Sequence, residues 1–270
     1  MTGALSLDFP QGVDMASSKW LLGFAATVGF SILAGCGAVF VNEGSKNASL
    51  AQGLQNPDAN QPKVSVPADQ KKVSDFEDGS TSVNPKLFGA HGGGWMAYSF
   101  AGNSTNGTFV VPGGANGDKM SAHVYGTLTD KGDGSYPSFT LQCNFNGNGP
   151  YDASPYDGIK FYYKCPAADQ DLKRRFGIGT SPTLANSEGG TCSNNCDNHF
   201  GVMLSSANDW VVYTLKFTDL TREQGWGAPV TPPDLVDHLK EFVCVKWDHG
   251  ANNAAGSYTI DYWVDDVEFF

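Results

Sequence analysis

The chain has 270 residues, with 28 acidic and 17 basic side chains and a formal net charge of −11. Because nucleic acids and anionic membrane surfaces are themselves negatively charged, this balance argues against either of them as a partner. A hydrophobic content of 40% is enough for a core, and 33 glycines and 14 prolines indicate many turns, so the composition predicts an all-β protein.

The N-terminal region has the pattern of an export signal. Lys19 precedes an apolar stretch from Trp20 to Leu33, which has the length of a signal peptide rather than of a full membrane span. The stretch ends in Leu33-Ala-Gly-Cys36, which resembles the lipobox of bacterial lipoproteins, where the cysteine is acylated and becomes the first residue of the mature protein. Residues 1–36 are therefore predicted to be an N-terminal extension and lipoprotein signal peptide, with lipidation at Cys36.

The resemblance to lipoproteins also predicts a location. Gly37 follows the cysteine, which in lipoproteins is compatible with sorting to the outer membrane. We expect a protein of the bacterial cell envelope whose contact with the membrane is the lipid anchor alone. Residues 37–72 are polar and contain only scattered small apolar side chains, so they are predicted to form a flexible tether.

Residues 73–270 are predicted to form one β domain. Short runs of alternating apolar and polar residues, separated by turn residues, recur along this part of the chain. The predicted strands are Trp95 to Phe100, Thr108 to Val111, Ser121 to Thr127, Phe139 to Phe145, Gly158 to Cys165, Lys173 to Gly179, Val211 to Phe217, Phe242 to Trp247 and Tyr258 to Phe270.

The alternation within these strands predicts which residues share a face. Ile159, Phe161 and Tyr163 share one face of their strand, and Val211, Tyr213, Leu215 and Phe217 share one face of theirs. The one helix predicted is short and runs from about Pro233 to Glu241, with Asp234 as its cap. Spaced strands with glycine-rich connections predict an antiparallel two-sheet β-sandwich of the jelly-roll type.

Acidic residues lie close to both ends of the predicted domain. Asp75-Phe-Glu-Asp-Gly79 opens the domain, and Asp265 and Asp266 lie in its last strand. Because domain termini are often neighbours in space, we expect these carboxylates to converge, and clustered oxygen ligands are what Ca²⁺ selects. The alternative is two surface strands with solvated acidic groups.

Several segments resemble bacterial carbohydrate-binding modules with a galactose-binding-like jelly roll, especially those of family 11. The segments are 75–79, 151–164, 209–220, 224–227 and 258–270, and their order along the chain is more specific than any one of them. The resemblance implies a non-catalytic domain that binds a polysaccharide or other glycan. It also implies a structural Ca²⁺ held by Glu77 and Asp266, with Asp75 and Asp265 as neighbours.

A sugar site needs flat aromatic rings and fixed polar side chains in a preformed cleft. Aromatic candidates for ligand binding are Trp95, Tyr98, Tyr125, Trp226 and Trp247, and the loop residues Asn144 and Asn146 supply amides. Sequence alternation does not say which of the aromatic residues face a cleft and which face the core.

Cysteines and glutamates suggest other possibilities. In an exported protein Cys192 and Cys196 are candidates for a disulfide that closes a loop. Paired carboxylates would be needed for a divergent glycoside hydrolase, and the glutamates of the folded part are Glu77, Glu188, Glu223, Glu241 and Glu268. A structural or protein-interaction domain with buried aromatic residues is the other alternative, so a protein partner is possible.

Overall fold

A computed structural model of the chain describes residues 63–100, 105–166, 172–251 and 255–270. The predicted signal peptide, the lipidation site Cys36 and residues 37–62 of the predicted tether lie outside the described residues, and they stay predictions. Within the part that is described, no helix is long and apolar enough to cross a membrane.

The folded domain begins earlier than the sequence predicted. Val66, which was assigned to the tether, is only 8% exposed and packs in the hydrophobic core. The Lys63 ammonium group donates a hydrogen bond to the backbone oxygen of Tyr156 at 2.7 Å. Gln70 and Lys71 also accept long-range backbone hydrogen bonds from Phe88 and Phe269. Residues 63–72 are therefore part of the domain.

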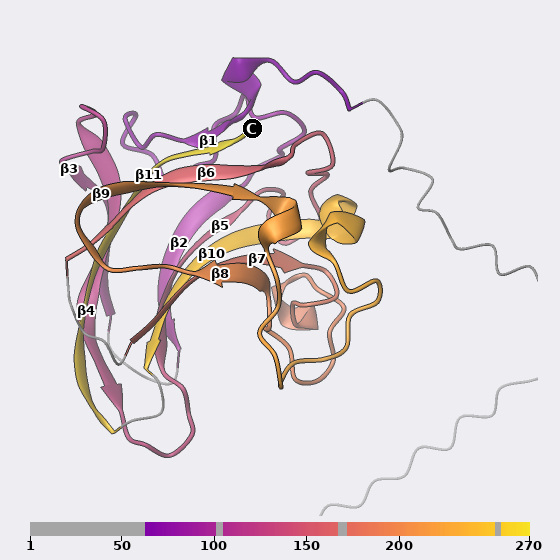
Figure 1. Cartoon of the computed structure of the whole chain (residues 1–270). Coiled ribbons are helices and arrows are strands. Elements are labelled where there is room, and N and C mark those ends of the chain that lie inside the picture. Colours follow the sequence, from indigo (N-terminus) through magenta and orange to yellow (C-terminus); the bar gives the residue numbers. More distant parts are fainter. Residues whose placement is uncertain (1–62, 101–104, 167–171, 252–254) are drawn as a thin grey trace, which may run out of the picture. The chain divides into compact units, whose positions relative to one another are not determined.

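Two antiparallel sheets form the domain, and they lie in two layers (Figure 1). The six-stranded sheet has the order β3-β4-β11-β6-β9, with β1 paired to β11. Its strands are β1 Lys72–Ser74, β3 Thr105–Pro112, β4 Met120–Asp130, β6 Gly158–Cys165, β9 Ala207–Lys216 and β11 Gly256–Phe269.

The five-stranded sheet has the order β2-β5-β10-β7-β8. Its strands are β2 Gly94–Phe100, β5 Ser138–Asn144, β10 Phe242–Ala251, β7 Leu172–Thr180 and β8 Phe200–Met203. Several neighbouring strands, such as β4 and β11 or β5 and β10, come from distant parts of the chain, as they do in a jelly roll. The predicted all-β, antiparallel two-sheet sandwich is confirmed.

The helices are short and of the 3-10 type. They are η1 Ala68–Gln70, η2 Asn186–Glu188, η3 Phe217–Asp219 and η4 Leu235–Glu241. The predicted helix near 233–241 is thus present as η4, but the Asp234 side chain makes no capping hydrogen bond. Val211, Tyr213 and Leu215 share one face of β9, as predicted, and Tyr213 and Leu215 pack against the core. Val211 is exposed because β9 lies at the edge of its sheet.

The core lies between the two sheets and is rich in aromatic rings. On β6 the side chains of Ile159, Phe161 and Tyr163 share one face, as predicted, and all three are fully buried. The ring of Trp247 on β10 packs edge-on against Phe161, with ring centroids 5.1 Å apart, and against Phe176 at 5.2 Å. The two sheets therefore meet across a contact between large aromatic side chains.

A histidine is also enclosed in this core. His249 on β10 stacks on Tyr262, with centroids 3.8 Å apart, and its Nε2 lies 2.9 Å from the Tyr163 hydroxyl. Burial, with a smaller contribution from the charge of Arg174, holds the pKa of His249 well below its ordinary value of 6.5. His199, buried in a loop, has its pKa lowered in the same direction, again mainly by burial.

Stability should fall as the pH drops below about 6.5. The unfolded chain takes up a proton on each of these histidines below that pH, whereas the folded chain does not. The free energy of unfolding should therefore decrease by about 1.4 kcal/mol per pH unit for each histidine. Denaturant titrations on both sides of pH 6.5 measure this slope. His249→Gln should reduce the slope of unfolding free energy against pH, whereas the control His91→Gln, at an exposed site, should leave it unchanged. Equal slopes in the wild type and His249→Gln would contradict the lowered pKa of His249.

Candidate functional site

Two of the predicted sugar-binding residues lie in the core. Trp95 on β2 and Trp247 on β10 are buried, and their ring centroids are 5.8 Å apart. Trp95 also packs edge-on against Phe76 at 5.0 Å. The prediction that they bind ligand is wrong, because both side chains point between the sheets.

Tyr125 lies on the six-stranded sheet, whereas Tyr98 and Asn144 lie on the five-stranded sheet. It is exposed on β4, where its ring stacks on His123, and His123 in turn stacks on Trp263 with centroids 4.1 Å apart. The ammonium group of Lys164 covers the other side of the Trp263 ring at 4.4 Å from the centroid. This row stands on the outer face of the six-stranded sheet, and the faces of its inner rings are already occupied by neighbours.

The outer face of the five-stranded sheet collects polar side chains. On β5 the residues Leu141 and Cys143 point into the core, so Gln142 and Asn144 point to the opposite side. The same alternation along β10 places Lys246 and Asp248 beside them. We call this surface the polar face; it consists of Tyr98, Thr140, Gln142, Asn144, Arg175, Lys246 and Asp248.

A chain of hydrogen bonds fixes the uncharged groups of the polar face. The Tyr98 hydroxyl donates to Gln142 Oε1 at 2.8 Å, and Gln142 Nε2 donates to Asn144 Oδ1 at 2.7 Å. Asn144 Nδ2 then donates to Asn148 Oδ1 at 3.1 Å. Gln142 is 7% exposed. Burial raises the pKa of Tyr98, so its hydroxyl remains a donor.

The charged groups of the polar face are paired. Lys246, which is 4% exposed, donates to Glu188 Oε2 at 3.1 Å. Burial disfavours the charged lysine, but the surrounding groups Cys244, Tyr98, Asp248 and Glu188 outweigh burial and raise the pKa of Lys246. The Thr140 hydroxyl donates to the carboxylate of Asp248. The floor of this surface is thus held in one arrangement by its own contacts.

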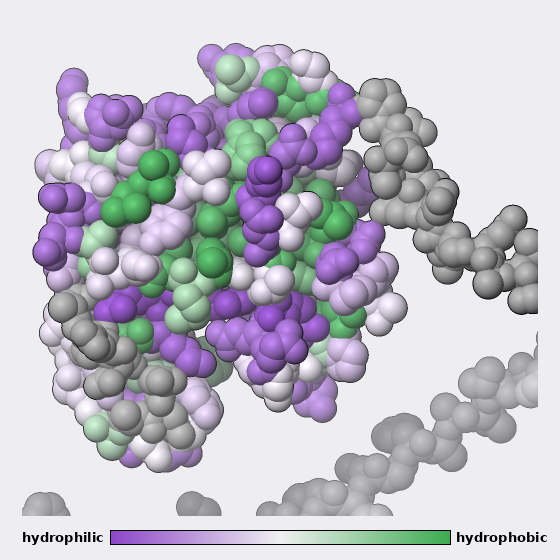
Figure 2. Space-filling view, in the orientation of Figure 1, coloured by the Kyte–Doolittle hydropathy of each residue, from purple (hydrophilic) through white to green (hydrophobic). Residues whose placement is uncertain are grey.

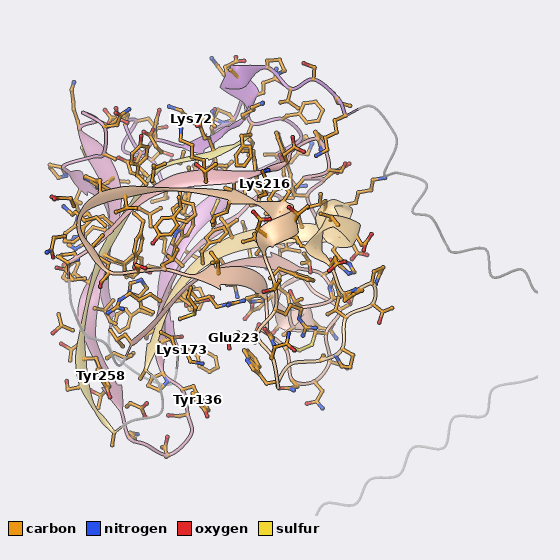
Figure 3. The ribbon with its side chains drawn as sticks, viewed as in Figure 1. Lys72, Tyr136, Lys173, Lys216, Glu223 and Tyr258 are labelled. Carbon is orange, nitrogen blue, oxygen red and sulfur yellow. A yellow bond between two sulfur atoms is a disulfide. The ribbon has the colours of Figure 1, made fainter. Side chains whose placement is uncertain are left out.

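Trp226 lies at the border of the polar face. Its ring is 44% exposed and its Nε1 donates to Glu223 Oε2 at 2.7 Å. The Glu223 carboxylate lies 3.8 Å from both Lys173 Nζ and Arg175 Nη1, which are side chains of β7. Figure 3 shows Lys173 and Glu223 close to each other. Trp226 and Glu223 also line a pocket of about 350 Å³ between residues 220–226 and 233–234.

Asn146 has a structural role in its loop. Its Oδ1 accepts the backbone N–H of His91 at 2.7 Å, and its Nδ2 donates to the backbone oxygen of Pro150 at 2.8 Å. Both polar ends of this amide are therefore used inside the protein. Of the predicted ligand residues, the structure brings Tyr98 and Asn144 together on the polar face and places Trp226 at its border.

The glutamates considered for hydrolysis all have partners in the protein. Glu188 pairs with Lys246 and Glu223 with Trp226, as described above. The other three are engaged at separate places: Glu77 with the backbone N–H groups of Lys119 and Met120, Glu241 with His238, and Glu268 with Lys160.

The acidic residues at the domain ends converge in part. Carboxylate oxygens of Asp118, Asp265 and Asp266 all lie within 4.8 Å of one another. Burial raises the pKa of Asp265 to about 7, although the backbone N–H groups of Ala115 and Asp266 lower it. Burial and the charge of Asp118 also raise the pKa of Asp266. Three carboxylates that lie close together offer the oxygen ligands that Ca²⁺ prefers, and a bound cation would offset the repulsion between their negative charges.

Two of the predicted metal ligands have other partners. Glu77 Oε1 accepts the backbone N–H groups of Lys119 and Met120 at 2.7 and 2.6 Å, next to Asp118. Asp75 accepts a hydrogen bond from Lys72 at 3.0 Å. The sequence did not single out Asp118, because it is far in sequence from both terminal segments. Only the folded domain brings Asp118 close to Asp266.

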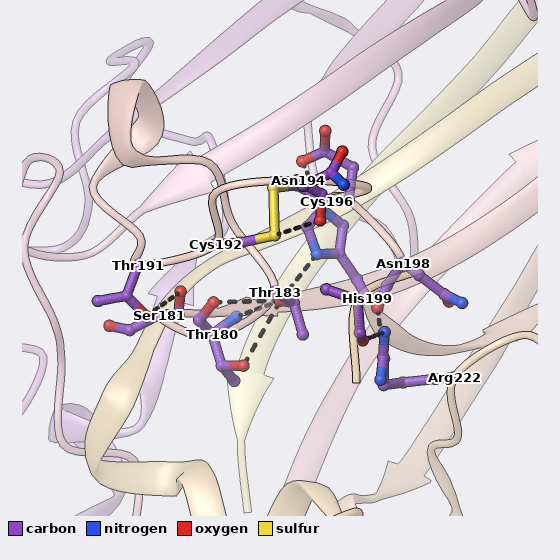
Figure 4. The surroundings of a disulfide bond; sticks show 12 residues. Thr180, Ser181, Thr183, Thr191, Cys192, Asn194, Cys196, Asn198, His199 and Arg222 are labelled. Carbon is purple, nitrogen blue, oxygen red and sulfur yellow. Dashed lines mark hydrogen bonds and ion pairs between the residues drawn. A yellow bond between two sulfur atoms is a disulfide. The ribbon is translucent and has the colours of Figure 1, made fainter. Parts of the chain in front are cut away.

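The disulfide between Cys192 and Cys196 is present, with Cα atoms 5.7 Å apart (Figure 4). Cys143, Cys165 and Cys244 are buried free thiols.

Residues of the polar face that the sequence did not single out are Thr140, Gln142, Arg175, Lys246 and Asp248. Alternation along β5 could have indicated Gln142, because Gln142 and Asn144 alternate with the apolar residues Leu141 and Cys143 and so face the opposite side of the strand.

Comparisons with known proteins found similarity among solved structures. No protein family matches the chain, and no curated protein matches it in sequence. A family 11 carbohydrate-binding module of a cellulosomal cellulase of Clostridium thermocellum is similar at 18% identity and a TM-score of 0.45, covering 65% of this chain and 86% of the module.

Two further structures are similar in the same way. A family 11 module of Clostridium thermocellum in complex with a β-1,3-1,4-mixed-linked tetrasaccharide has 16% identity and a TM-score of 0.47, covering 74% of this chain and 94% of that one. The module CBM27-1 of Caldicellulosiruptor saccharolyticus, in complex with mannohexaose, has 11% identity and a TM-score of 0.34, covering 73% and 93%. Carbohydrate-binding modules, family 11 among them, are therefore among the solved structures to which this chain is similar.

Proposed function

We propose that this protein binds a carbohydrate on the polar face and carries out no chemistry on it. The observation that carries the proposal is the hydrogen-bonded series Tyr98–Gln142–Asn144 on the outer face of the five-stranded sheet. Sugar hydroxyls need donors and acceptors at fixed positions. Each amide of the series uses one N–H and one carbonyl lone pair for its neighbours, and the second N–H and the second lone pair suit a sugar hydroxyl without being ordered on binding.

The charges of the polar face favour a neutral ligand. Lys246 is paired with Glu188, and Arg175 lies near Glu223, so neither cation is free to balance an added negative charge. Tyr98 and the exposed ring of Trp226 supply the aromatic surface that packs against the C–H groups of a sugar. A neutral polysaccharide therefore suits this surface better than a uronic acid polymer.

Binding should depend on the polar face and not on the opposite sheet. Tyr98→Ala and Gln142→Ala should each weaken binding about tenfold, which corresponds to about 1.4 kcal/mol. Tyr125→Ala is the matched control, because it removes an exposed tyrosine from the other sheet. Isothermal titration with mixed-linkage β-glucan, β-1,4-mannan and β-1,4-galactan measures the affinities. No heat with any polysaccharide from a folded sample, or an equal loss in Tyr125→Ala, would count against the proposal.

The sequence supports a finer proposal about location. The lipobox-like segment Leu33 to Cys36 suggests that the carbohydrate-binding domain is held at the bacterial cell envelope, at the outer membrane, by a lipid. Expression in a bacterium with a labelled fatty acid should label the wild type and Cys192→Ser but not Cys36→Ser. Label retained in Cys36→Ser would overturn the anchor.

The acidic cluster supports a structural Ca²⁺ bound by Asp118, Asp265 and Asp266. The ion would relieve the repulsion among these carboxylates and fix the loop before β4 to the last strand. At a hundredfold excess over its Kd, Ca²⁺ stabilises by about 2.7 kcal/mol, so the Tm should rise by at least about 5 °C relative to chelator. Asp118→Asn should lose this shift and the exposed-loop control Asp133→Asn should keep it. A melting curve that is the same in Ca²⁺ and in chelator would overturn the site.

A further inference from the structure

The polar face is covered on one side by the loop 181–199. Leu184 of this loop is fully buried, and two glycines of β7 make room for the loop. A Cβ on Gly179 would lie 3.0 Å from a Leu184 methyl carbon and 2.7 Å from Cys244 Sγ, and one on Gly177 would lie 3.3 Å from His199 Cβ. The loop therefore lies directly on the outer surface of β7 and β10.

Internal contacts hold this loop in place. Its Cys192–Cys196 disulfide closes a short turn, and Thr183 Oγ1 lies 3.0 Å from His199 Nδ1 (Figure 4). The Lys246–Glu188 ion pair ties the loop to the floor of the polar face. These contacts hold the loop 181–199 in one position, so that it forms a fixed wall rather than a movable lid.

A second segment extends the wall along β7 and β8. Arg175 Nη2 donates to the backbone oxygens of His199 at 3.1 Å and Thr221 at 2.8 Å. Asn198 Nδ2 donates to the backbone oxygens of Glu223 and Trp226 at 2.9 and 2.6 Å. The segment 221–226 and the loop 181–199 are thus joined. We call the two together the wall.

On its other side the polar face ends at β2, and no strand of the part of the chain that the structure describes pairs with the outer edge of β2. On the edge strand β2, Met96 is 41% exposed and Phe100 is 61% exposed, and Tyr98 lies between them on the same face of the strand. Figure 2 shows a hollow at the lower edge of the molecule, with hydrophilic residues along one side of it. In the same view Figure 3 places Lys173 and Glu223 beside this hollow. The described residues therefore cover the polar face on its β7 side, whereas on its β2 side the exposed residues Met96 and Phe100 flank Tyr98.

We propose that the polar face binds the end of a glycan chain, with the terminal sugar against the wall at Lys246 and Glu188. This inference rests on the proposed carbohydrate binding. A glycan that enters over β2 and crosses β5 reaches β10 after two strand spacings, about 10 Å, and there it meets the wall. A chain that continued across the strands would collide with the loop 181–199, so an internal segment does not fit in this direction.

The number of protein molecules bound per glycan chain tests this inference. End binding predicts that a hexasaccharide and size-fractionated polymers of mixed-linkage β-glucan, β-1,4-mannan or β-1,4-galactan each bind the same number of protein molecules per chain, whatever their length. Isothermal titration or sedimentation gives this number. A stoichiometry that grows in proportion to chain length would overturn the inference and leave the proposed function standing. Absence of binding to every polymer and hexasaccharide would overturn both.

A pair of variants tests the position of the terminal sugar. Glu188→Ala removes the partner of Lys246 at the wall and should weaken hexasaccharide binding about tenfold. Glu268→Ala is the matched control, because its carboxylate makes a similar ion pair with Lys160 on the other sheet, at 2.7 Å. Equal affinities of a folded Glu188→Ala variant and the wild type would overturn this placement. If Glu188→Ala does not fold, the stoichiometry of the wild type still decides between end and internal binding.

Discussion

Burial of the Trp247 ring between the sheets fixes which side of β10 faces the core. Its ring packs against Trp95, Phe161 and Phe176, so it joins strands from both sheets. Because side chains alternate along a strand, the residues on either side of Trp247 must then point outward. A shift of one residue in this strand would put two charged groups into the aromatic core, and the polar face would not exist.

The polar face combines groups that are costly to bury with contacts that reduce the cost. Gln142 and Asn144 are hydrogen-bonded to each other, and their remaining polar ends bond to Tyr98 and Asn148. Lys246 has a carboxylate partner supplied by the loop 181–199. A buried lysine without such a partner would be strongly destabilising. The loop 181–199 therefore does two things: it closes one side of the polar face, and its Glu188 stabilises the buried charge of Lys246.

At the acidic end of the domain, the backbone brings three carboxylates close together. β1 pairs with β11, so the two ends of the folded domain lie side by side. Next to this pairing Asp266 adopts a positive φ of 48°, and the ladder between β11 and β6 is irregular from Asp265 to Glu268. The irregular backbone brings Asp265 and Asp266, which are neighbours in sequence, toward the same point as Asp118.

The amino-acid sequence by itself determined most of the strands, the two-sheet class and the cysteine pair, because alternation and turn residues act over a few positions. Strand β8, Phe200–Met203, gave too short a signal to be found, and its pairing with β7 defines it. Only the tertiary structure decided that Trp95 and Trp247 face inward while Tyr98 faces outward, and that Asp118 joins the terminal acids. Alternation separates the two faces of a strand, but the packing of whole sheets and loops decides which face becomes core and which becomes a site.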